Sequence, residues 1–241
     1  MNLVWQIMKK DLRRVAWILG LWAVAGIYLT AYRKFAIVQG SLWDNLGVFS
    51  LMTFVALTCA LIAMIVQEDG LAGSNESWRT RPISPGKLLA AKLGLIFACY
   101  VFLPIMVVLL QSLLFETSIS VTDLPYTLPV LAVMVLGCAA MAAVTKDLGR
   151  YFLSGLLCIM VSVMLALAMT ELIELDPQSK ANVLHYGMAR LQGVVAIVGL
   201  ASIIVLANQY FMRRKAVSYV AIAVAVVGTA LVGAFWRWPL L

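Results

Sequence analysis

Seven long apolar runs dominate this sequence of 241 residues and leave few folds open to it. Each run approaches or exceeds the roughly 20 mostly apolar residues that a helix needs to cross the hydrocarbon core of a bilayer. Hydrophobic residues make up 63% of the chain and charged residues only 12%, so water is not its main solvent. The runs cover residues 15–32, 46–66, 88–115, 125–144, 151–170, 192–212 and 216–235.

The backbone of a membrane-spanning segment must satisfy its own hydrogen bonds, and apolar runs of this length do so as helices. A β-barrel would instead show stretches of about ten residues with alternating polarity. We therefore predict an all-α fold, a polytopic transmembrane bundle of about seven spans. Little sequence is left for a soluble domain, so function is expected to lie in the bundle and its loops.

Lysine and arginine gather on one side of the predicted bundle, and the positive-inside rule assigns that side to the cytoplasm. Only Arg33, Lys34, Lys180, Arg190 and Arg237 fall on the opposite side. The N terminus is thus predicted to be inside and the C terminus outside. The net charge of +7 follows from this topology and does not indicate a nucleic-acid partner. The cytoplasmic set is Lys9, Lys10, Arg13, Arg14, Arg79, Arg81, Lys87, Lys92, Lys146, Arg150, Arg213, Arg214 and Lys215.

Residues 1–14 have the pattern of an amphipathic interface helix that precedes the first span. An apolar stripe that includes Val4, Met8 and Leu12 lies opposite a cluster of cations, and Asp11 falls within the stripe. Such a helix would lie along the headgroups before it turns into the bilayer. The alternative is a simple basic flank. The cations of the predicted interface helix are Lys9, Lys10, Arg13 and Arg14.

Residues 67–87 form the one long cytoplasmic loop, and a passive connector could be much shorter. The loop is either a solvated connector or a docking surface for a soluble subunit. Trp78 followed by Arg79 and Arg81 favours docking, because aromatic and arginine residues are enriched in interface hot spots. The residues predicted to couple the bundle to a partner are Glu68, Asp69, Trp78, Arg79, Arg81 and Lys87.

The residue inventory offers no catalytic centre, cofactor site or metal site. His185 is the single histidine and has no neighbouring ligand, and the sequence holds no GxxxxGK[ST] phosphate-binding loop. The cysteines are interpreted as small core residues, one in each of four separate apolar runs: Cys59, Cys99, Cys138 and Cys158.

Neutral polar residues inside the spans are expected to form hydrogen bonds between helices. They are Gln111, Thr53, Thr58, Ser162, Asn208 and Gln209. In the last span, small residues recur every four positions and form a stripe that lets helices approach closely, within the chain or between copies. That stripe is Ala221, Ala225, Thr229 and Gly233.

The order of parts resembles the permease subunits of type-2 ABC exporters. A basic amphipathic helix and two spans are followed by a loop that opens with Glu68-Asp69 and contains the segment 78–84, and then by Lys92 early in the third span. The resemblance implies a coupling helix in loop 67–87 that contacts a cytoplasmic ABC ATPase subunit, and a second permease chain as partner. It also implies short helical elements in the outer loop 171–190.

The expected organisation is an interface helix (1–14), a six-span permease-like bundle (15–212) and an additional C-terminal span (213–241), since the family core has six spans. The expected function is export of an amphipathic or lipid-like substrate across a membrane, with bacterial cytoplasmic (inner) membrane as the expected location. Energy would come from a separate ATPase, so the chain alone is not expected to be an enzyme. The main alternative is a scaffold subunit of another membrane complex that does not transport, and a third possibility is an intramembrane enzyme.

Overall fold

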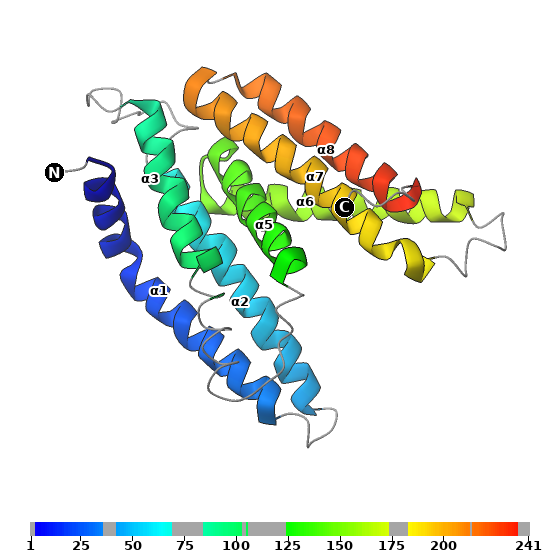
Figure 1. Cartoon of the computed structure of the whole chain (residues 1–241), viewed down its shortest axis with the longest axis horizontal. Coiled ribbons are helices and arrows are strands. Elements are labelled where there is room, and N and C mark those ends of the chain that lie inside the picture. Colours follow the sequence, from blue (N-terminus) through cyan, green and yellow to red (C-terminus); the bar gives the residue numbers. More distant parts are fainter. Residues whose placement is uncertain are drawn as a thin grey trace.

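The computed structural model describes residues 3–35, 42–68, 84–102, 105, 124–173, 183–212 and 214–235, and this part of the chain is almost entirely helical (Figure 1). It contains seven α-helices and two π-helical turns, and none of the described residues lies in a strand. The prediction of an all-α fold is confirmed.

The described helices coincide with the predicted apolar runs in part. Helix α1 begins 12 residues before its run, and α7 begins nine residues before its run, inside the predicted outer loop 171–190. Two of them end in a π-helical turn. In chain order the elements are α1 (Leu3–Phe35), α2 (Leu42–Gln67), α3 (Pro85–Phe97) with η3 (Ala98–Phe102), α5 (Leu124–Val144), α6 (Leu148–Ile173), α7 (Val183–Ala207) with η6 (Asn208–Met212), and α8 (Lys215–Phe235).

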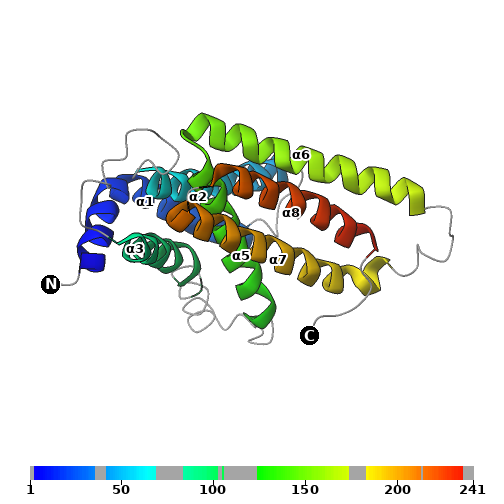
Figure 2. The ribbon, with the colours of Figure 1, turned by 90° about the horizontal axis from the view of Figure 1, so that it is seen from above.

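The helices form two arms that diverge from a shared end of the molecule (Figure 1). One arm consists of α1, α2 and α3, and the other of α6, α7 and α8. Helix α5 lies between them and packs against both α2 and α7. Helix α8 runs beside α7 in both views (Figures 1 and 2) and also packs against α6. The shared end collects the first turns of α1, α3, α6 and α8 and the last turns of α2, α5 and α7. These are the helix ends that the predicted topology places in the cytoplasm.

Four of the described helices are long and apolar enough to cross a membrane. They include Pro85–Phe102, Leu148–Leu165, Arg190–Met212 and Lys215–Gly233, while Met52–Gln67 and Leu128–Val144 are shorter apolar helices. The chain therefore has the character of a membrane protein. Seven spans and their orientation stay predictions.

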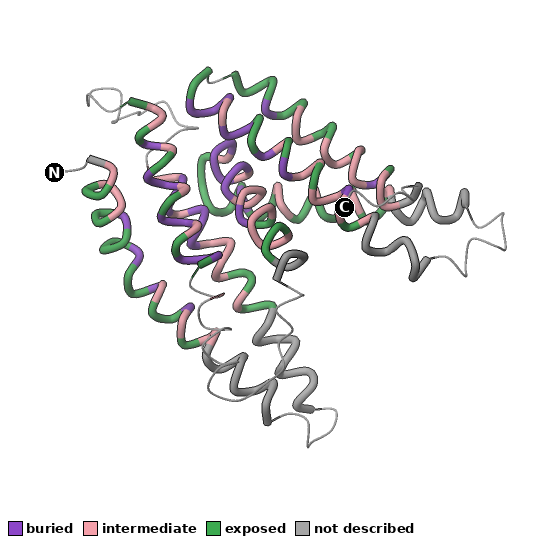
Figure 3. Tube along the Cα trace, in the orientation of Figure 1, coloured by how far each residue is buried: buried purple, intermediate pink, exposed green. Residues whose placement is uncertain are grey.

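Burial divides the helices sharply (Figure 3). The core lies where α2, α3 and α5 meet, and it includes Leu61, Ile62, Ile96, Ala139 and Ala143, all with no exposed surface. Helix α6, by contrast, exposes most of its apolar side chains along its described length.

Small residues allow close helix contacts in the second arm. A Cβ atom on Gly199 of α7 would lie 3.2 Å from Val133 of α5, and one on Gly228 of α8 would lie 3.4 Å from Ile197 of α7. A Cβ on Gly233 would meet nothing within 4 Å. The close approach of α8 to α7 thus runs through Gly228, whereas Gly233, in the predicted stripe, faces open space in this chain.

Helix α1 is continuous from Leu3 to Phe35, so the predicted interface segment and first span are joined without a loop. Its first turns nevertheless run at a clear angle to the rest (Figure 2). Helix α3 begins at Pro85, as expected for a proline in the first turn. Ser84 precedes it in extended conformation, and its backbone carbonyl accepts hydrogen bonds from Lys87 and Leu88, but its side chain makes no capping hydrogen bond.

Candidate functional site: a buried charge network at the shared end

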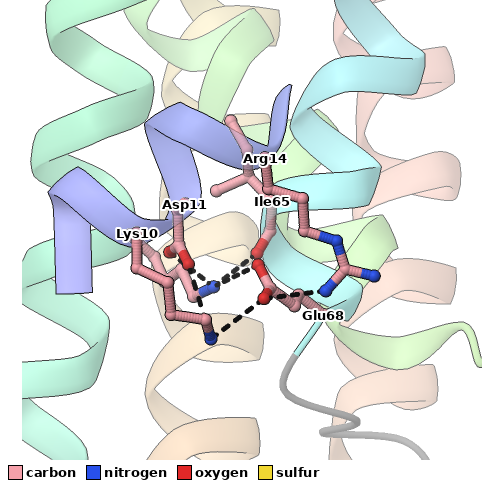
Figure 4. A network of polar contacts seen from close by, with 6 residues as sticks. Lys10, Asp11, Arg14, Ile65 and Glu68 are labelled. Carbon is pink, nitrogen blue, oxygen red and sulfur yellow. Dashed lines mark hydrogen bonds and ion pairs between the residues drawn. The ribbon is translucent and has the colours of Figure 1, made fainter. Parts of the chain in front are cut away.

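A buried ion pair joins the first and third helices (Figure 4). Lys92 of α3 lies with its Nζ 2.8 Å from Oδ2 of Asp11 of α1, and both side chains are only 1% exposed. Charged side chains are almost never fully buried unless they are paired. The pair therefore fixes where the start of α1 lies against α3.

The end of α2 supplies the second partner of Lys92. The Nζ atom donates a hydrogen bond of 2.7 Å to the backbone carbonyl of Ile65 and lies 3.9 Å from Oε2 of Glu68. The last four carbonyls of a helix have no partner within the helix, and that of Ile65 is one of them. Lys92 thus satisfies a helix end as well as a carboxylate.

Glu68 connects this buried pair to the cations of the predicted interface helix. Its Oε1 lies 2.9 Å from Nζ of Lys10 and accepts a hydrogen bond of 2.8 Å from Arg14. Lys10 and Arg14 are four residues apart and share one face of α1. Their side chains are 52% and 65% exposed, whereas that of Glu68 is 7% exposed. The network therefore runs from the interior to the surface.

The two carboxyl groups differ in their electrostatic surroundings. Burial raises the pKa of Glu68, but the hydrogen bonds from Lys10 and Arg14 and the charge of Lys92 outweigh it and hold this pKa at about 2. Burial raises the pKa of Asp11, and the neighbouring Lys92 offsets this only in part. Glu68 is thus the more firmly ionised of the two carboxylates.

The network ties together α1, the end of α2 and the start of α3, and the last two flank loop 67–87 in the sequence. Glu68 stands where the loop leaves α2, and Lys92 lies two turns into α3, which follows the loop. Both contact α1, through Lys10, Asp11 and Arg14. The described residues contain no group of three histidine, cysteine or acidic side chains that could hold a metal ion. What this arrangement can do is hold the first turns of α1 against the end of α2 and the start of α3.

The structure brings together three of the predicted site residues, Glu68, Lys10 and Arg14. Lys9 and Arg13 are exposed on α1, and Lys87 is exposed in the first turn of α3. The remaining predicted coupling residues, Asp69, Trp78, Arg79 and Arg81, lie outside the described residues.

The pairing of Asp11 with Lys92 is the feature that sequence reasoning missed. Asp11 lies within the stripe that was assigned to the headgroups, and Lys92 lies near the predicted cytoplasmic end of its span. The available signal was an isolated acid and an isolated base, each on the apolar face of a helix and on the same predicted side of the membrane.

Neutral polar residues join other helices, as predicted. Asn208 and Gln209 donate hydrogen bonds of 2.7 and 2.9 Å to Oγ of Ser218, which ties η6 to α8. Trp22 of α1 donates a hydrogen bond of 2.7 Å to Thr58 of α2. The prediction of hydrogen bonds between helices is confirmed for Thr58, Asn208 and Gln209.

Two of the cysteines lie closer together than their sequence spacing suggests. Cys59 of α2 and Cys138 of α5 have their sulfur atoms 3.7 Å apart in a partly buried contact. Both are free thiols. Their close packing supports the interpretation of Cys59 and Cys138 as small core residues.

Comparison of the chain with protein-family models, curated proteins and solved structures gives no match.

Proposed function

We propose that this chain is the membrane-spanning permease subunit of an ATP-driven ABC transporter. It would export an amphipathic or lipid-like substrate, pair with a second permease chain, and receive energy from separate cytoplasmic ATPase subunits through loop 67–87. The proposal includes seven spans, a cytoplasmic N terminus and a bacterial inner-membrane location.

The observation that carries the proposal is the charge network of Asp11, Lys92, Glu68, Lys10 and Arg14. A loop that receives force from a partner needs a firm connection to the bundle, and a buried ion pair supplies directional contacts that are costly to break. Both sides of the loop and the interface helix meet in this network. A passive connector has no need of such a junction.

The second candidate function is a scaffold subunit of another membrane complex, which does not transport. The extensive apolar surface of α6 favours it equally, because an exposed helix face suits either lipid or a neighbouring subunit. The two candidates differ in whether the cytoplasmic partner binds ATP.

Affinity purification of the full chain from its native membrane distinguishes these candidates. The permease proposal expects a stoichiometric partner with a GxxxxGK[ST] motif, and ATP hydrolysis only when that partner is present. A stable complex without any nucleotide-binding subunit would support the scaffold. ATP turnover by the chain alone would contradict both and favour an enzyme.

A triple variant tests the loop itself. Trp78→Ala removes the proposed apolar anchor, for which truncation at a hot spot typically costs about 2 kcal/mol or more of binding free energy. Arg79→Glu and Arg81→Glu reverse the charges that would fix the register of docking. Recovery of the ATPase should fall while the bundle stays folded. A matched control, Lys9→Gln with Arg13→Gln, alters exposed cations on α1 and should leave recovery unchanged. Normal recovery and transport in the triple variant would exclude coupling through this loop.

Reporter fusions test the topology. The permease proposal expects positions 79, 146 and 214 inside, and positions 33, 123, 180 and the C terminus outside. A cytoplasmic C terminus would mean that one of the seven predicted spans does not cross.

A further inference from the structure

A pocket opens between the start of α6, the end of α5 and the start of α8. Its volume is about 350 Å³, and three cationic side chains, Lys146, Arg150 and Lys215, contribute to its lining. The lining also contains Leu153, Leu157 and Tyr219, which belong to α6 and α8. No acidic side chain is among the described residues that line it. The pocket thus has a cationic part and an apolar part.

The cationic part lies at the shared end of the bundle. Lys146 is in the link between α5 and α6, Arg150 is in the first turn of α6, and Lys215 is the first residue of α8. Asp147, an exposed acidic residue of the same link, pairs with Arg150 at 3.3 Å and accepts a hydrogen bond from the Arg150 backbone N–H. The described lining itself carries three cationic side chains and no acidic one. The first turns of α6 and α8 add the positive ends of two helix dipoles.

The apolar part continues along α6 away from the cations. Leu153, Leu157, Met160 and Met164 follow Arg150 at helical spacing, and each is 59–67% exposed. From Leu153 to Met164 the helix rises about 16 Å. This is close to the roughly 15 Å depth of one leaflet of the hydrocarbon core. The exposed apolar side chains of α6 therefore form a track that starts at the cationic pocket and is about as long as one leaflet is deep.

We propose that this pocket binds an anionic phospholipid, with the phosphate among Lys146, Arg150 and Lys215 and one acyl chain along the α6 track. Basic pockets between spans on the cytoplasmic side suit acidic headgroups, and exposed apolar side chains suit the chain that is attached to them. A soluble phosphate has no apolar part that could contact Leu153, Leu157 and the exposed apolar side chains beyond them. The inference does not rest on the permease function, because it concerns a different face of the molecule.

The test is a titration of the purified full chain with dioleoyl phosphatidylglycerol, followed by native mass spectrometry. Dioleoyl phosphatidylcholine, with the same acyl chains, measures recognition without net negative charge, and inorganic phosphate measures recognition without a chain. We expect phosphatidylglycerol to bind as a one-to-one adduct in preference to phosphatidylcholine, and inorganic phosphate not to displace it.

Variants locate the site. Arg150→Gln with Lys215→Gln should weaken phosphatidylglycerol binding by about fivefold for each cation, so on the order of 25-fold in total. The matched control Lys9→Gln with Arg13→Gln removes two exposed cations from α1 and should leave binding unchanged. Ser154→Trp fills the pocket without changing its charge and should also abolish the adduct, whereas Ser162→Trp, two turns further along α6, should not.

Four results would overturn the proposal. Equal binding of both lipids would exclude recognition of charge, and displacement by inorganic phosphate would assign the pocket to a free anion. Equal loss in the α1 control would show general attraction to the basic surface. A lipid-free dimer whose assembly is lost in Ser154→Trp would show that a second copy of the chain covers this face.

Discussion

Helices α3 and α6 are similarly apolar, yet one is central and the other peripheral. Their 18-residue segments have mean hydropathies of 1.4 and 1.8, but 44% of the α3 segment is buried against 6% of the α6 segment. Hydropathy reports whether a helix suits lipid and does not report which neighbours it has. Helix α3 also buries a charge, Lys92, for which α1 and α2 provide the partners. Apolarity alone therefore does not distinguish the helix that packs inside the bundle from the one at its surface.

The largest effect is expected from breaking that charge pair. Lys92→Met should lower the free energy of unfolding by about 3–5 kcal/mol, because it leaves Asp11 buried without its partner. The double variant Asp11→Leu with Lys92→Met removes both charges and should recover most of the loss. Reversible unfolding in mixed micelles measures both variants. Equal losses in the single and double variants would show that an unpaired, buried Asp11 carboxylate is not what destabilises Lys92→Met.

A smaller loss is expected where α8 meets α7. Gly228→Leu should cost about 1–3 kcal/mol, since its side chain would collide with Ile197. Gly233→Leu meets open space and should leave the unfolding of the single chain unchanged. If Thr229→Leu with Gly233→Leu reduces oligomer size while the chain stays folded, the predicted stripe contacts a second copy. Unchanged oligomer size would assign that stripe to lipid.

The polar network should also make the first arm sensitive to acid. The folded state holds the pKa of Glu68 at about 2 against an ordinary 4.5, so its stabilisation is present above pH 4.5 and is lost as the pH falls toward 2. The raised pKa of Asp11 acts in the opposite sense and disfavours the folded state as the pH rises above 3.8. Because Lys10 and Arg14 are largely exposed, solvent screening keeps the effect of Glu68 modest.

Thermal unfolding between about pH 6 and pH 3 measures this dependence. Glu68→Gln should reduce the loss of thermal stability between about pH 4.5 and pH 3. Asp147→Asn, which changes an exposed carboxylate in the other arm, should leave that loss unchanged. If Glu68→Gln loses as much stability at low pH as the unchanged protein, other groups cause the acid sensitivity.

The smallest effect is expected on the exposed face of α6. Leu156→Ala should change the free energy of unfolding by no more than about 0.5 kcal/mol, because the side chain is 56% exposed. Ile96→Ala, at a fully buried position of α3, should cost about 2–5 kcal/mol in the same assay. A comparable loss at both positions would remove the distinction between the two helices.

Much of the helical framework follows from the sequence. The predicted run 125–144 corresponds to Leu124–Val144, and the run 216–235 to Lys215–Phe235. Such agreement is expected because a long apolar run has few ways other than a helix to satisfy its backbone. Helix α3 begins at a proline, Pro85, whose missing N–H has no intrahelical partner to lose in the first turn.

The site was only partly predictable, because its central contact is tertiary. Asp11 and Lys92 were each recognisable as a charge near an apolar run, but nothing local in the sequence specifies that α1 and α3 are neighbours. Glu68 was predicted as a coupling residue, whereas its contacts with Lys10 and Arg14 depend on how α1 crosses the end of α2. Periodicity specifies the face of a helix, and packing specifies what that face meets.

The Asp11–Lys92 pair also has a consequence for biosynthesis. The ribosome adds about 5–20 residues per second, so the roughly 80 residues between the two positions take about 4–16 s to translate. During that interval the carboxylate of Asp11 must remain hydrated, because the lysine that compensates its burial has not yet been made. Helix α1 can therefore pack in its final position only after α3 has been synthesised.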